Sequence, residues 1–298
     1  EAGKLGLSPK QVRTYSIGMR GSPDLKFARI AAEFLGTDHM EVLLSEEEFL
    51  AAIPDTIYYT ESFDTTTVRA SVGNYLVSKH IAQTSDDTVI FVGDVADEIF
   101  GSYRGFTRAP SPEAFANANA QMLFDIHYFD VLRSDRSISA AGLEARVPFA
   151  DLEFLRFCMV LSPKEYKMFE SKPGSRPMEK QVLREAFDGY LPESVLWRRK
   201  EAFSDGVSPE RKAWYEIIRE HVEKQAIKPP HKDAVNYFDA STSFASLCDW
   251  DLESQWYHSL YTGFFGHKQL PAPVPFFWRH PFATTGAEDP SARSLACY

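Results

Sequence analysis

An acidic turn follows an apolar segment in the first third of the chain, and its residue types could do phosphate or magnesium chemistry. Thr88–Phe91 predicts a strand, and the residues after it are Val92, Gly93, Asp94, Val95, Ala96, Asp97 and Glu98. α/β proteins place such chemistry where a strand meets a turn. Val95 and Ala96 stand where bare backbone would have to approach an anion. The turn therefore indicates either a nucleotide-using enzyme with an altered site or an ordinary acidic turn.

The elements that must position this turn follow an alternating pattern. Short apolar runs predict strands at Thr14–Gly18, Met40–Leu44 and Thr88–Val92. The helices between them have capping signals, with Ser22 before Pro23 and Ser45 before Glu46. Strands that alternate with helices favour a parallel sheet, and the β-branched third run predicts a strand covered on both faces.

The rest of the chain has a different character. Helical spacing dominates from Ser111 to about Glu223, over the ranges 115–132, 152–161, 179–187 and 209–223. Lys228-Pro229-Pro230 indicates a linker. We therefore expect a first part at residues 1–225, a sheet followed by helices, and an aromatic, proline-rich C-terminal extension at 226–298 packed on it. The extension includes a helical stretch at 252–264 and the run Pro271–Pro275.

Composition excludes several classes of protein. The chain has 298 residues, 44% hydrophobic and 25% charged, with a net charge of −10. The charge argues against a general nucleic-acid binder, and no apolar run is long enough for a membrane span. Three cysteines, Cys158, Cys248 and Cys297, lie far apart, which argues against a zinc site or disulfide framework. Cys158 lies in an apolar run and is expected in the core.

Several separated strings together resemble one family. They are Thr14–Gly18, Gly21–Leu25, Asp64–Ser71, Asp97–Tyr103, Gly142–Phe149, Met178–Arg184, Trp197–Val207 and Asp289–Leu295. In order and spacing they resemble the synthetase domain of glutamine-dependent asparagine synthetase. The resemblance implies an α/β fold of the PP-loop ATP pyrophosphatase type (adenine nucleotide alpha hydrolase-like), a parallel sheet with a large helical addition. It also implies aspartate amidation through an aspartyl-AMP intermediate, with ATP and Mg²⁺.

The resemblance assigns roles to nine positions. They are Lys180 and Asp94 for catalysis, Thr66, Thr67 and Arg69 for substrate, Ser16, Ile17 and Gly93 for nucleotide, and Asp97 for metal. Simpler interpretations stay open for several of them. Lys180 could be a helix-surface lysine, and Arg69 could brace Asp64 or Glu61. Glu144 and Arg146, beside the site, could form a structural ion pair.

Two departures from the family pattern bear on activity. The family has a Ser-Gly-Gly-x-Asp-Ser loop before the Thr14 strand and a glutaminase domain, and Glu1–Arg13 resembles neither. The family's Ser-Gly-Glu-Gly-[Ser/Ala]-Asp-Glu loop has Val92, Asp94 and Val95 in place of serine, glutamate and glycine. We expect Val95 to direct a branched side chain toward the ligand. Asp94 is one methylene short, and a displacement of about 1 Å can cost ~10²-fold in rate.

Two hypotheses follow. In the first, the protein is a non-catalytic asparagine-synthetase-like protein, a structural or accessory subunit of a larger assembly or a homo-oligomer, with no cofactor. In the second, it is an active asparagine synthetase whose missing loop and glutaminase lie on an unseen N-terminal region. A relative acting on another acyl substrate, such as β-lactam synthetase, fits Ser204–Gly206 less well. The resemblance implies a cytoplasmic protein and leaves a mitochondrial location open.

Overall fold

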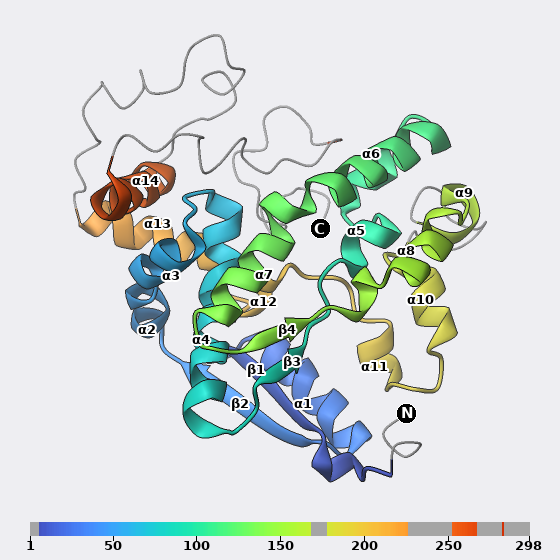
Figure 1. Cartoon of the computed structure of the whole chain (residues 1–298), viewed down its shortest axis with the longest axis horizontal. Coiled ribbons are helices and arrows are strands. Elements are labelled where there is room, and N and C mark those ends of the chain that lie inside the picture. Colours follow the sequence, from blue (N-terminus) through green and yellow to red (C-terminus); the bar gives the residue numbers. More distant parts are fainter. Residues whose placement is uncertain (1–5, 168–177, 226–251, 267–281, 283–298) are drawn as a thin grey trace.

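The strands form two separate parallel pairs rather than one continuous sheet. The computed structural model describes residues 6–167, 178–225, 252–266 and 282. In one pair β1 (Arg13–Met19) lies beside β2 (Asp38–Leu44), and in the other β3 (Val89–Phe91) lies beside β4 (Glu144–Arg146). Figure 1 shows both pairs in the lower half of the molecule, below most of the helices. The parallel arrangement within each pair is as predicted. No strand pairing among the described residues connects the two pairs into one sheet.

The first helices begin at the residues that the capping signals predict. Ser22 accepts a hydrogen bond from the Leu25 amide at the start of α1 (Pro23–Leu35), and Gly36 ends this helix with φ 71°. Such a left-handed C-cap suits glycine, which has no Cβ. Ser45 and Glu48 form a reciprocal capping box at the start of α2 (Glu46–Ala51). These confirmed predictions are local, because each cap involves groups only three residues apart.

The third strand differs from its prediction. Phe91 is 77% exposed and Val89 is 44% exposed, so β3 is not covered on both faces. Strand alternation places these two side chains on one face, while Ile90 on the other face packs against Ile81, Ile138 and Leu143. The β-branched run predicted the strand, whereas its environment depends on what lies against it.

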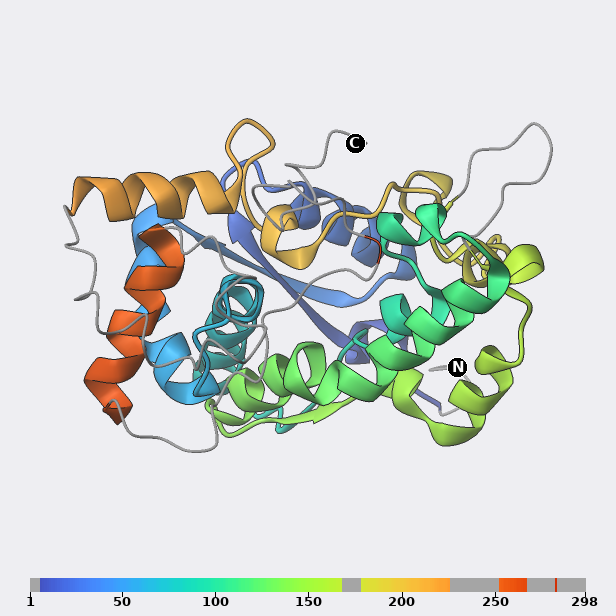
Figure 2. The same cartoon turned by 90° about the horizontal axis from the view of Figure 1, so that it is seen from above.

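Helices make up most of the described part of the chain. The helices of the first part are α3 (Ile53–Thr60), α4 (Thr65–Thr84), α5 (Ala96–Phe100), α6 (Pro112–Asp125), α7 (Asp130–Ser139), α8 (Leu152–Met159), α9 (Pro163–Tyr166), α10 (Gln181–Ala186), α11 (Glu193–Leu196), α12 (Phe203–Gly206) and α13 (Trp214–Lys224). Short 3₁₀ turns lie at Pro9–Gln11, Arg104–Arg108, Ile126–Tyr128 and Pro148–Ala150. Viewed from above in Figure 2, α6 and α7 follow one another along one side of the molecule, and α13 lies on the other. The helical character predicted after Ser111 is confirmed.

The main core joins the first part of the chain to α14 (Leu252–Phe265). Phe49, Val68 and Trp214 are buried in one cluster with Tyr257 and Tyr261 of α14. This helix falls within the predicted extension, whose residues 226–251, 267–281 and 283–298 lie outside the described part of the chain. The division at residue 225 stays a prediction. Cys158 is 2% exposed, as expected of a core residue. None of the described helices is both long and apolar enough to cross a membrane.

Candidate functional site

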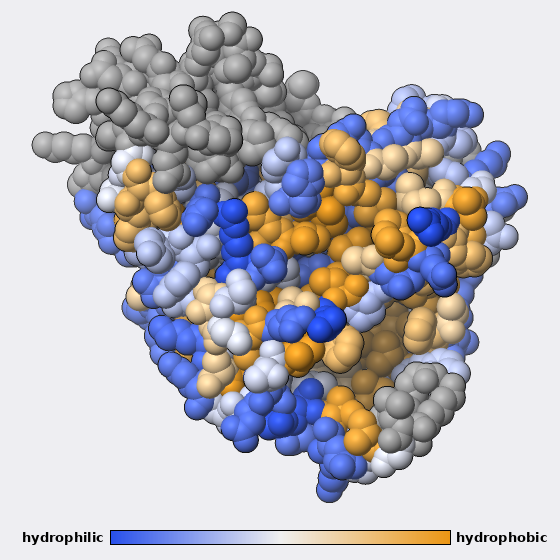
Figure 3. Space-filling view, viewed as in Figure 1, coloured by the Kyte–Doolittle hydropathy of each residue, from blue (hydrophilic) through white to orange (hydrophobic). Residues whose placement is uncertain are grey.

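A cavity of about 470 Å³ lies between α1, β1 and the segment that runs from α10 to α12. A cavity of this size suits a small-molecule ligand. In Figure 3, drawn from the same side as Figure 1, the surface is hollowed at the lower right, the region where Figure 1 labels α11. The residues that line the cavity are Tyr15, Ser16, Ile17, Asp24, Phe27, Ala28, Ala31, Asp97, Lys180, Arg184, Val195, Arg198, Arg199, Lys200, Glu201 and Phe203.

The cavity wall contains more cations than carboxylates. Five lysine and arginine side chains line it against three acidic ones. The protein as a whole is acidic, so this local excess of positive charge is a property of the cavity. A concave site with such an excess favours anions. Phe27, Ala28 and Ala31 of α1 also line the cavity, and the Arg198 guanidinium lies over the Phe27 ring, 4.3 Å from its centre.

Two lysines converge on Asp97 at the edge of the cavity. Lys180 Nζ lies 3.0 Å from Asp97 Oδ1, and Lys200 Nζ lies 3.4 Å from Oδ2. Burial opposes ionisation of Asp97, but Lys200 and Lys180 outweigh it and lower the pKa of the carboxyl. Asp97 is therefore ionised at neutral pH and holds both ammonium groups at one point.

The backbone is strained at two positions beside this ion-pair cluster. Val95 has φ 76° and Lys180 has φ 56°, both in the left-handed region that side chains other than glycine rarely adopt. Lys180 is also the N-cap of α10, so this conformation sets the direction from which its side chain reaches Asp97. Strained residues of this kind cluster at functional sites, where the surrounding structure holds them in place.

Val95 does not point into the cavity, which corrects the expectation from the sequence. Its side chain is 5% exposed and packs with Ile99, Phe100 and Cys158 in a cluster between α5 and α8. The left-handed turn directs its Cβ inward, so the branched side chain fills the core. Val92 packs against a different cluster, with Ile81 among its members. Neither valine is among the described residues that line the cavity.

Asp94 faces α7 instead of the cavity. Its Oδ2 accepts a hydrogen bond from Ser134 Oγ at 2.5 Å, and its Oδ1 lies 3.4 Å from Arg133 Nη2. Arg133 also contacts Asp130 at 2.7 Å, and its side chain is 12% exposed. Burial opposes the charge on Arg133, but Asp130 and Asp94 outweigh it and raise the pKa of the guanidinium. Both oxygens of Asp94 are thus engaged by one helix.

A second buried carboxyl lies behind the same turn. Glu98 accepts a hydrogen bond from the Tyr103 hydroxyl, and its backbone carbonyl accepts one from the Asn119 amide. Burial, with the negative charges of Asp130 and Asp97, raises the pKa of Glu98 to about 8. Glu98 is therefore mostly protonated at neutral pH, and the turn is supported by a polar network that the cavity does not use.

The structure brings together four of the nine predicted site residues. Ser16, Ile17, Asp97 and Lys180 line the cavity, whereas Gly93 and Asp94 are not among the described lining residues. The other three lie at the start of α4. Thr67 is buried there, and the amide of Thr67 donates to the cap residue Asp64.

Arg69 lies in a buried ion pair with α14. Its Nε and Nη2 lie 2.7 and 2.6 Å from the two carboxylate oxygens of Glu253, and both side chains are 4% exposed. The Trp214 indole donates to the Arg69 carbonyl at 3.3 Å. The substrate-binding role predicted for Thr66, Thr67 and Arg69 stays a prediction. The suggested structural pair of Glu144 and Arg146 is confirmed, at 2.6 Å between exposed side chains.

Sequence reasoning missed Lys200 as a site residue. It lies in Trp197–Val207, a string that contributed to the resemblance without a role of its own. The sequence feature that could have indicated it is the run of four charged residues at 198–201, in which Lys200 follows two arginines and precedes Glu201. All four residues line the cavity. Gly206, in the same string, lies against Asp24: a Cβ there would come 2.1 Å from Asp24 Oδ2. Asp24 in turn pairs with Arg198 at 2.8 Å.

The described donors do not suit a magnesium ion held by the protein alone. Within residues 6–167, 178–225, 252–266 and 282, no group of three or more His, Cys, Asp or Glu side chains is placed to hold a metal. Asp97 offers one carboxylate, and two ammonium groups already compensate it. Magnesium usually binds through one or two carboxylates together with substrate phosphates. The metal role of Asp97 stays a prediction.

Comparison with known proteins decides the family. The profile of the asparagine synthase family matches residues 5–125 and 111–260. The chain belongs to the asparagine synthase family. It is 37% identical over 292 residues to the glutamine-hydrolyzing asparagine synthetase of Homo sapiens, covering 96% of this chain and 49% of that protein. The Rattus norvegicus protein of that name is 38% identical over 295 residues, covering 97% and 49%. The Gallus gallus protein is 38% identical over 292 residues, covering 96% and 49%.

The chain spans about half the length of these curated relatives. The family match and these identities confirm the resemblance to asparagine synthetases that the sequence motifs indicated. Shared ancestry of the synthetase half also explains why four motif residues from distant parts of the chain, Ser16, Ile17, Asp97 and Lys180, meet at one cavity.

Proposed function

We propose that this asparagine-synthetase-like protein binds a nucleoside triphosphate in the cavity and does not itself complete aspartate amidation. It would then serve as a structural or accessory subunit of a larger assembly or homo-oligomer. One observation carries the proposal: Asp97 faces the cavity between Lys180 and Lys200, whereas Asp94 is held on α7 by Arg133 and Ser134. The groups proposed to bind the ligand thus lie at the cavity, whereas Asp94, the carboxylate proposed to react in the family, points away from it.

The binding half of the proposal depends on which side chains line the cavity. A triphosphate needs several cationic donors, and Lys180, Lys200 and Arg184 are among the lining residues. A purine ring needs a flat or apolar surface, and Ala28 and Ala31 of α1, with the Arg198 guanidinium that lies over Phe27, would supply one. Displacing Asp97 from its two lysines exchanges one anion for another, so the lysines would keep a charged partner when phosphate binds.

The non-catalytic half depends on Asp94. A reacting carboxylate must lie within hydrogen-bond distance of the atom whose proton it takes. Ser134 and Arg133 hold both Asp94 oxygens, and the side chain is one methylene shorter than the family's glutamate. Reaching the cavity would require breaking these contacts. Val95 does not obstruct the cavity, because its side chain is buried in the core.

The alternative is an active asparagine synthetase, and the retained cations favour it. Lys180 contacts Asp97 from a left-handed backbone conformation. Strain of about 1–3 kcal/mol persists only where the surrounding structure enforces it, and such residues cluster at active sites. In that case ATP and Mg²⁺ would be required, and the missing loop and glutaminase would lie on a region of the protein outside this sequence.

The proposed fold is a single PP-loop-type sheet that contains both strand pairs. From β1, Tyr15 donates to Asp87 at 2.8 Å and Arg13 pairs with Asp87 at 2.6 Å, just before β3. The two pairs are thus linked through side chains at one edge. A cytoplasmic location, which only the family resemblance implies, stays a prediction.

Two measurements on the longest natural form of the protein separate the candidates. Calorimetry should show saturable binding of ATP, lost in the double variant Lys180→Met/Lys200→Met and kept in Lys224→Met, whose side chain is 78% exposed. Aspartate-dependent ATP–pyrophosphate exchange should be absent. Absence of ATP binding would sink the nucleotide proposal. Robust exchange would instead establish the active enzyme.

A further inference from the structure

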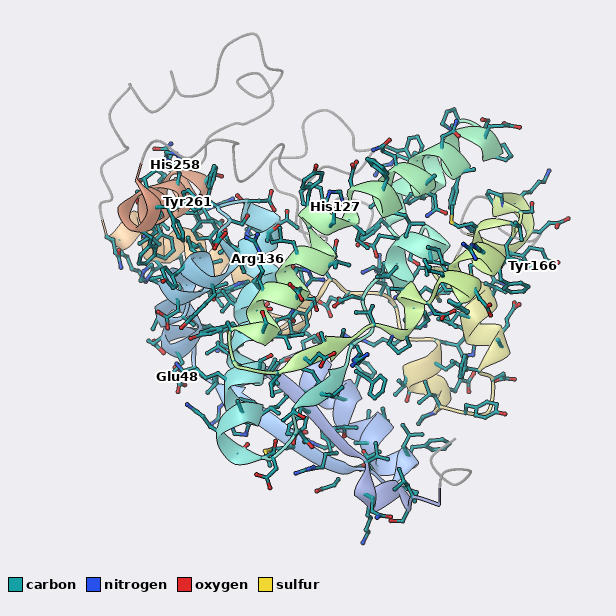
Figure 4. All side chains as sticks on the ribbon, viewed as in Figure 1. Glu48, His127, Arg136, Tyr166, His258 and Tyr261 are labelled. Atoms are coloured by element: carbon teal, nitrogen blue, oxygen red, sulfur yellow. The ribbon has the colours of Figure 1, made fainter. Side chains whose placement is uncertain are left out.

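A buried carboxylate connects the two segments that carry the cavity lysines. Glu179 directly precedes Lys180 in the chain, and it is 5% exposed. Its Oε1 accepts a hydrogen bond from the backbone amide of Lys200 and lies 3.2 Å from Arg184 Nη2. In Figure 4 the side chains of α10 and α11 lie at the right of the view, below the labelled Tyr166. The carboxylate is therefore bonded to the chain at residue 200, while its own backbone adjoins residue 180.

Arg184, one turn into α10, holds the same carboxylate and a third segment. Its Nε donates to the Glu179 carbonyl at 2.7 Å, and its Nη1 donates to the carbonyl of Leu196, the last residue of α11. With the contact from Nη2, protein acceptors engage all three guanidinium nitrogens. We call Glu179 and Arg184 the clamp pair. The pair fixes the start of α10 against the segment that leads from α11 to Lys200.

The clamp pair accounts for the backbone conformation of Lys180. This residue has φ 56°, a conformation that persists only where the surrounding structure enforces it. The Arg184 side chain holds the carbonyl of Glu179, and the Arg184 amide donates to the Lys180 carbonyl at 2.9 Å. These bonds fix the peptide groups before and after Lys180. They therefore set the direction from which its side chain reaches Asp97.

The clamp pair does not depend on the group that a ligand would displace. Asp97 now holds both ammonium groups, at 3.0 and 3.4 Å. A phosphate that took its place would remove this contact, and a lysine side chain is flexible over four carbons. Glu179 is not among the described residues that line the cavity, so its bonds to Lys200 and Arg184 would persist in the liganded protein. Donors held in place before binding lose less conformational entropy when the ligand arrives.

We propose that the clamp pair positions Lys180 and Lys200 for an anionic ligand. Glu179 and Arg184 are then positioning residues, which act through the backbone of the two lysines. The inference rests on the proposed nucleotide site for its effect on affinity. The placement of the lysines is a property of the protein without ligand, so it can be measured separately.

Replacing both members of the clamp pair by apolar side chains separates positioning from stability. Glu179→Met/Arg184→Met leaves no buried charge without its partner, so the full chain should unfold in urea much as the unaltered protein does. Acetylation of the lysines without nucleotide, followed site by site by mass spectrometry, measures how firmly they are held. We expect Lys180 and Lys200 to react roughly two- to fivefold faster in the variant, as when an ion pair is loosened. Lys224, which is 78% exposed, is the internal reference.

Three further variants define the result. Glu179→Gln keeps an acceptor for the Lys200 amide and should leave the acetylation rate of Lys200 near its original value. Arg184→Lys keeps the charge beside Glu179 but cannot reach all the acceptors of the guanidinium, so it should accelerate both lysines even if the double variant fails to fold. Glu185→Ala removes an exposed carboxylate from the same helix and should change neither rate.

Unchanged acetylation of Lys180 and Lys200 in the double variant, or in Arg184→Lys, would overturn the proposal. Equal acceleration in the control Glu185→Ala would overturn it too, because the effect would then not be specific to the clamp pair. A rate in Glu179→Gln as high as that of the double variant would contradict the role of the bond to the Lys200 amide.

Calorimetric titration with ATP connects the clamp pair to the proposed site. Arg184→Lys keeps a cation at the cavity, and we expect its ATP affinity to fall by roughly three- to tenfold, because lysines not held beforehand must be ordered when phosphate binds. Unchanged affinity in this variant would refute the role of the clamp pair in binding. If the unaltered protein does not bind ATP, the nucleotide proposal fails, and acetylation still decides whether the clamp pair positions the lysines.

Discussion

Two aspartates three residues apart on one turn have opposite environments. Asp97 lies at the edge of the cavity with the ammonium groups of two lysines, whereas Asp94 lies against α7 between a serine and a largely buried arginine. The turn sends them in different directions because Val95 between them adopts a left-handed conformation. The residue predicted to bind metal therefore lies at the cavity, while the residue predicted to react packs against α7.

The physical difference lies in how easily each ion-pair cluster can be rearranged. Lys180, Lys200 and Asp97 have side chains that are 23%, 18% and 23% exposed, and water can compensate each when a ligand displaces its partner. Arg133, Asp94 and Asp130 are 12%, 17% and 22% exposed, so the clusters differ mainly in that one guanidinium holds two aspartates at once. Removing one partner from a buried cluster leaves an uncompensated charge, which costs far more than loss of an exposed pair.

The largest effect is expected on the α7 side. Arg133→Met would leave Asp94 and Asp130 close together without their counter-charge, so we expect the free energy of unfolding to fall by about 3–5 kcal/mol. Urea denaturation followed by circular dichroism measures this change. Arg146→Met is the control, because Arg146 and Glu144 form an exposed pair worth less than about 1 kcal/mol. Equal losses in the two variants would remove the distinction between the clusters.

The cavity side should respond in binding rather than in stability. Lys180→Met and Lys200→Met each remove one charge-assisted contact to phosphate, worth about 1.5–3 kcal/mol, so ATP affinity should fall by roughly 10- to 100-fold in each variant. Unfolding should change little, because the remaining lysine still compensates Asp97. Calorimetric titration with ATP measures the affinity. A variant that unfolds more easily while binding ATP normally would show that these lysines are structural.

A pH titration tests the network behind the turn. Glu98 has a pKa of about 8 when folded, above its usual value near 4.5, so the folded state binds its proton more tightly than the unfolded state. Its contribution is fully present below pH 4.5 and is lost as the pH rises through 8. The groups facing it are Tyr103, Asp130 and Asp97. Between pH 6 and 8 we expect the free energy of unfolding to fall by about 2 kcal/mol through this group.

Glu98→Gln supplies the comparison for this titration. The amide is uncharged at every pH and still accepts from Tyr103, so the variant should lose the part of the pH dependence that Glu98 causes. Denaturation midpoints of both proteins at pH 6 and pH 8 measure the difference. If the two proteins show the same dependence on pH, the charge on Glu98 does not govern this region.

Local chemistry made much of the fold predictable. The caps at Ser22 and Ser45 involve groups within one turn of helix, and each lies where the sequence predicts it. The family resemblance also implied that Ser16 and Lys180 share a site, and both line the cavity. Such predictions succeed because they depend on residue type at short range or on a pattern kept across a whole family.

The parts that failed depend on contacts between distant segments. Asp94 meets Ser134 and Arg133, some forty residues away, and nothing in the turn itself specifies this partner. The exposure of Phe91 likewise depends on which elements cover β3. The direction of Val95 was wrong for a related reason: its positive φ could be foreseen from the glycine that it replaces, but not the cluster that receives its side chain.

Val95 gives the finest test of the comparison, because it separates backbone strain from steric obstruction. Val95→Gly would relieve about 1–2 kcal/mol of strain and lose about 1.5–3 kcal/mol of buried side chain, for a net loss near 1 kcal/mol. Val95→Ala keeps the strain and should lose somewhat more than the glycine variant. ATP affinity should stay within about twofold in both, because the valine side chain lies in the core. Calorimetry and urea denaturation measure both quantities. A large gain in ATP affinity for Val95→Gly would mean that the valine side chain obstructs the ligand. The opposite directions of Asp94 and Asp97 would then not explain the altered site.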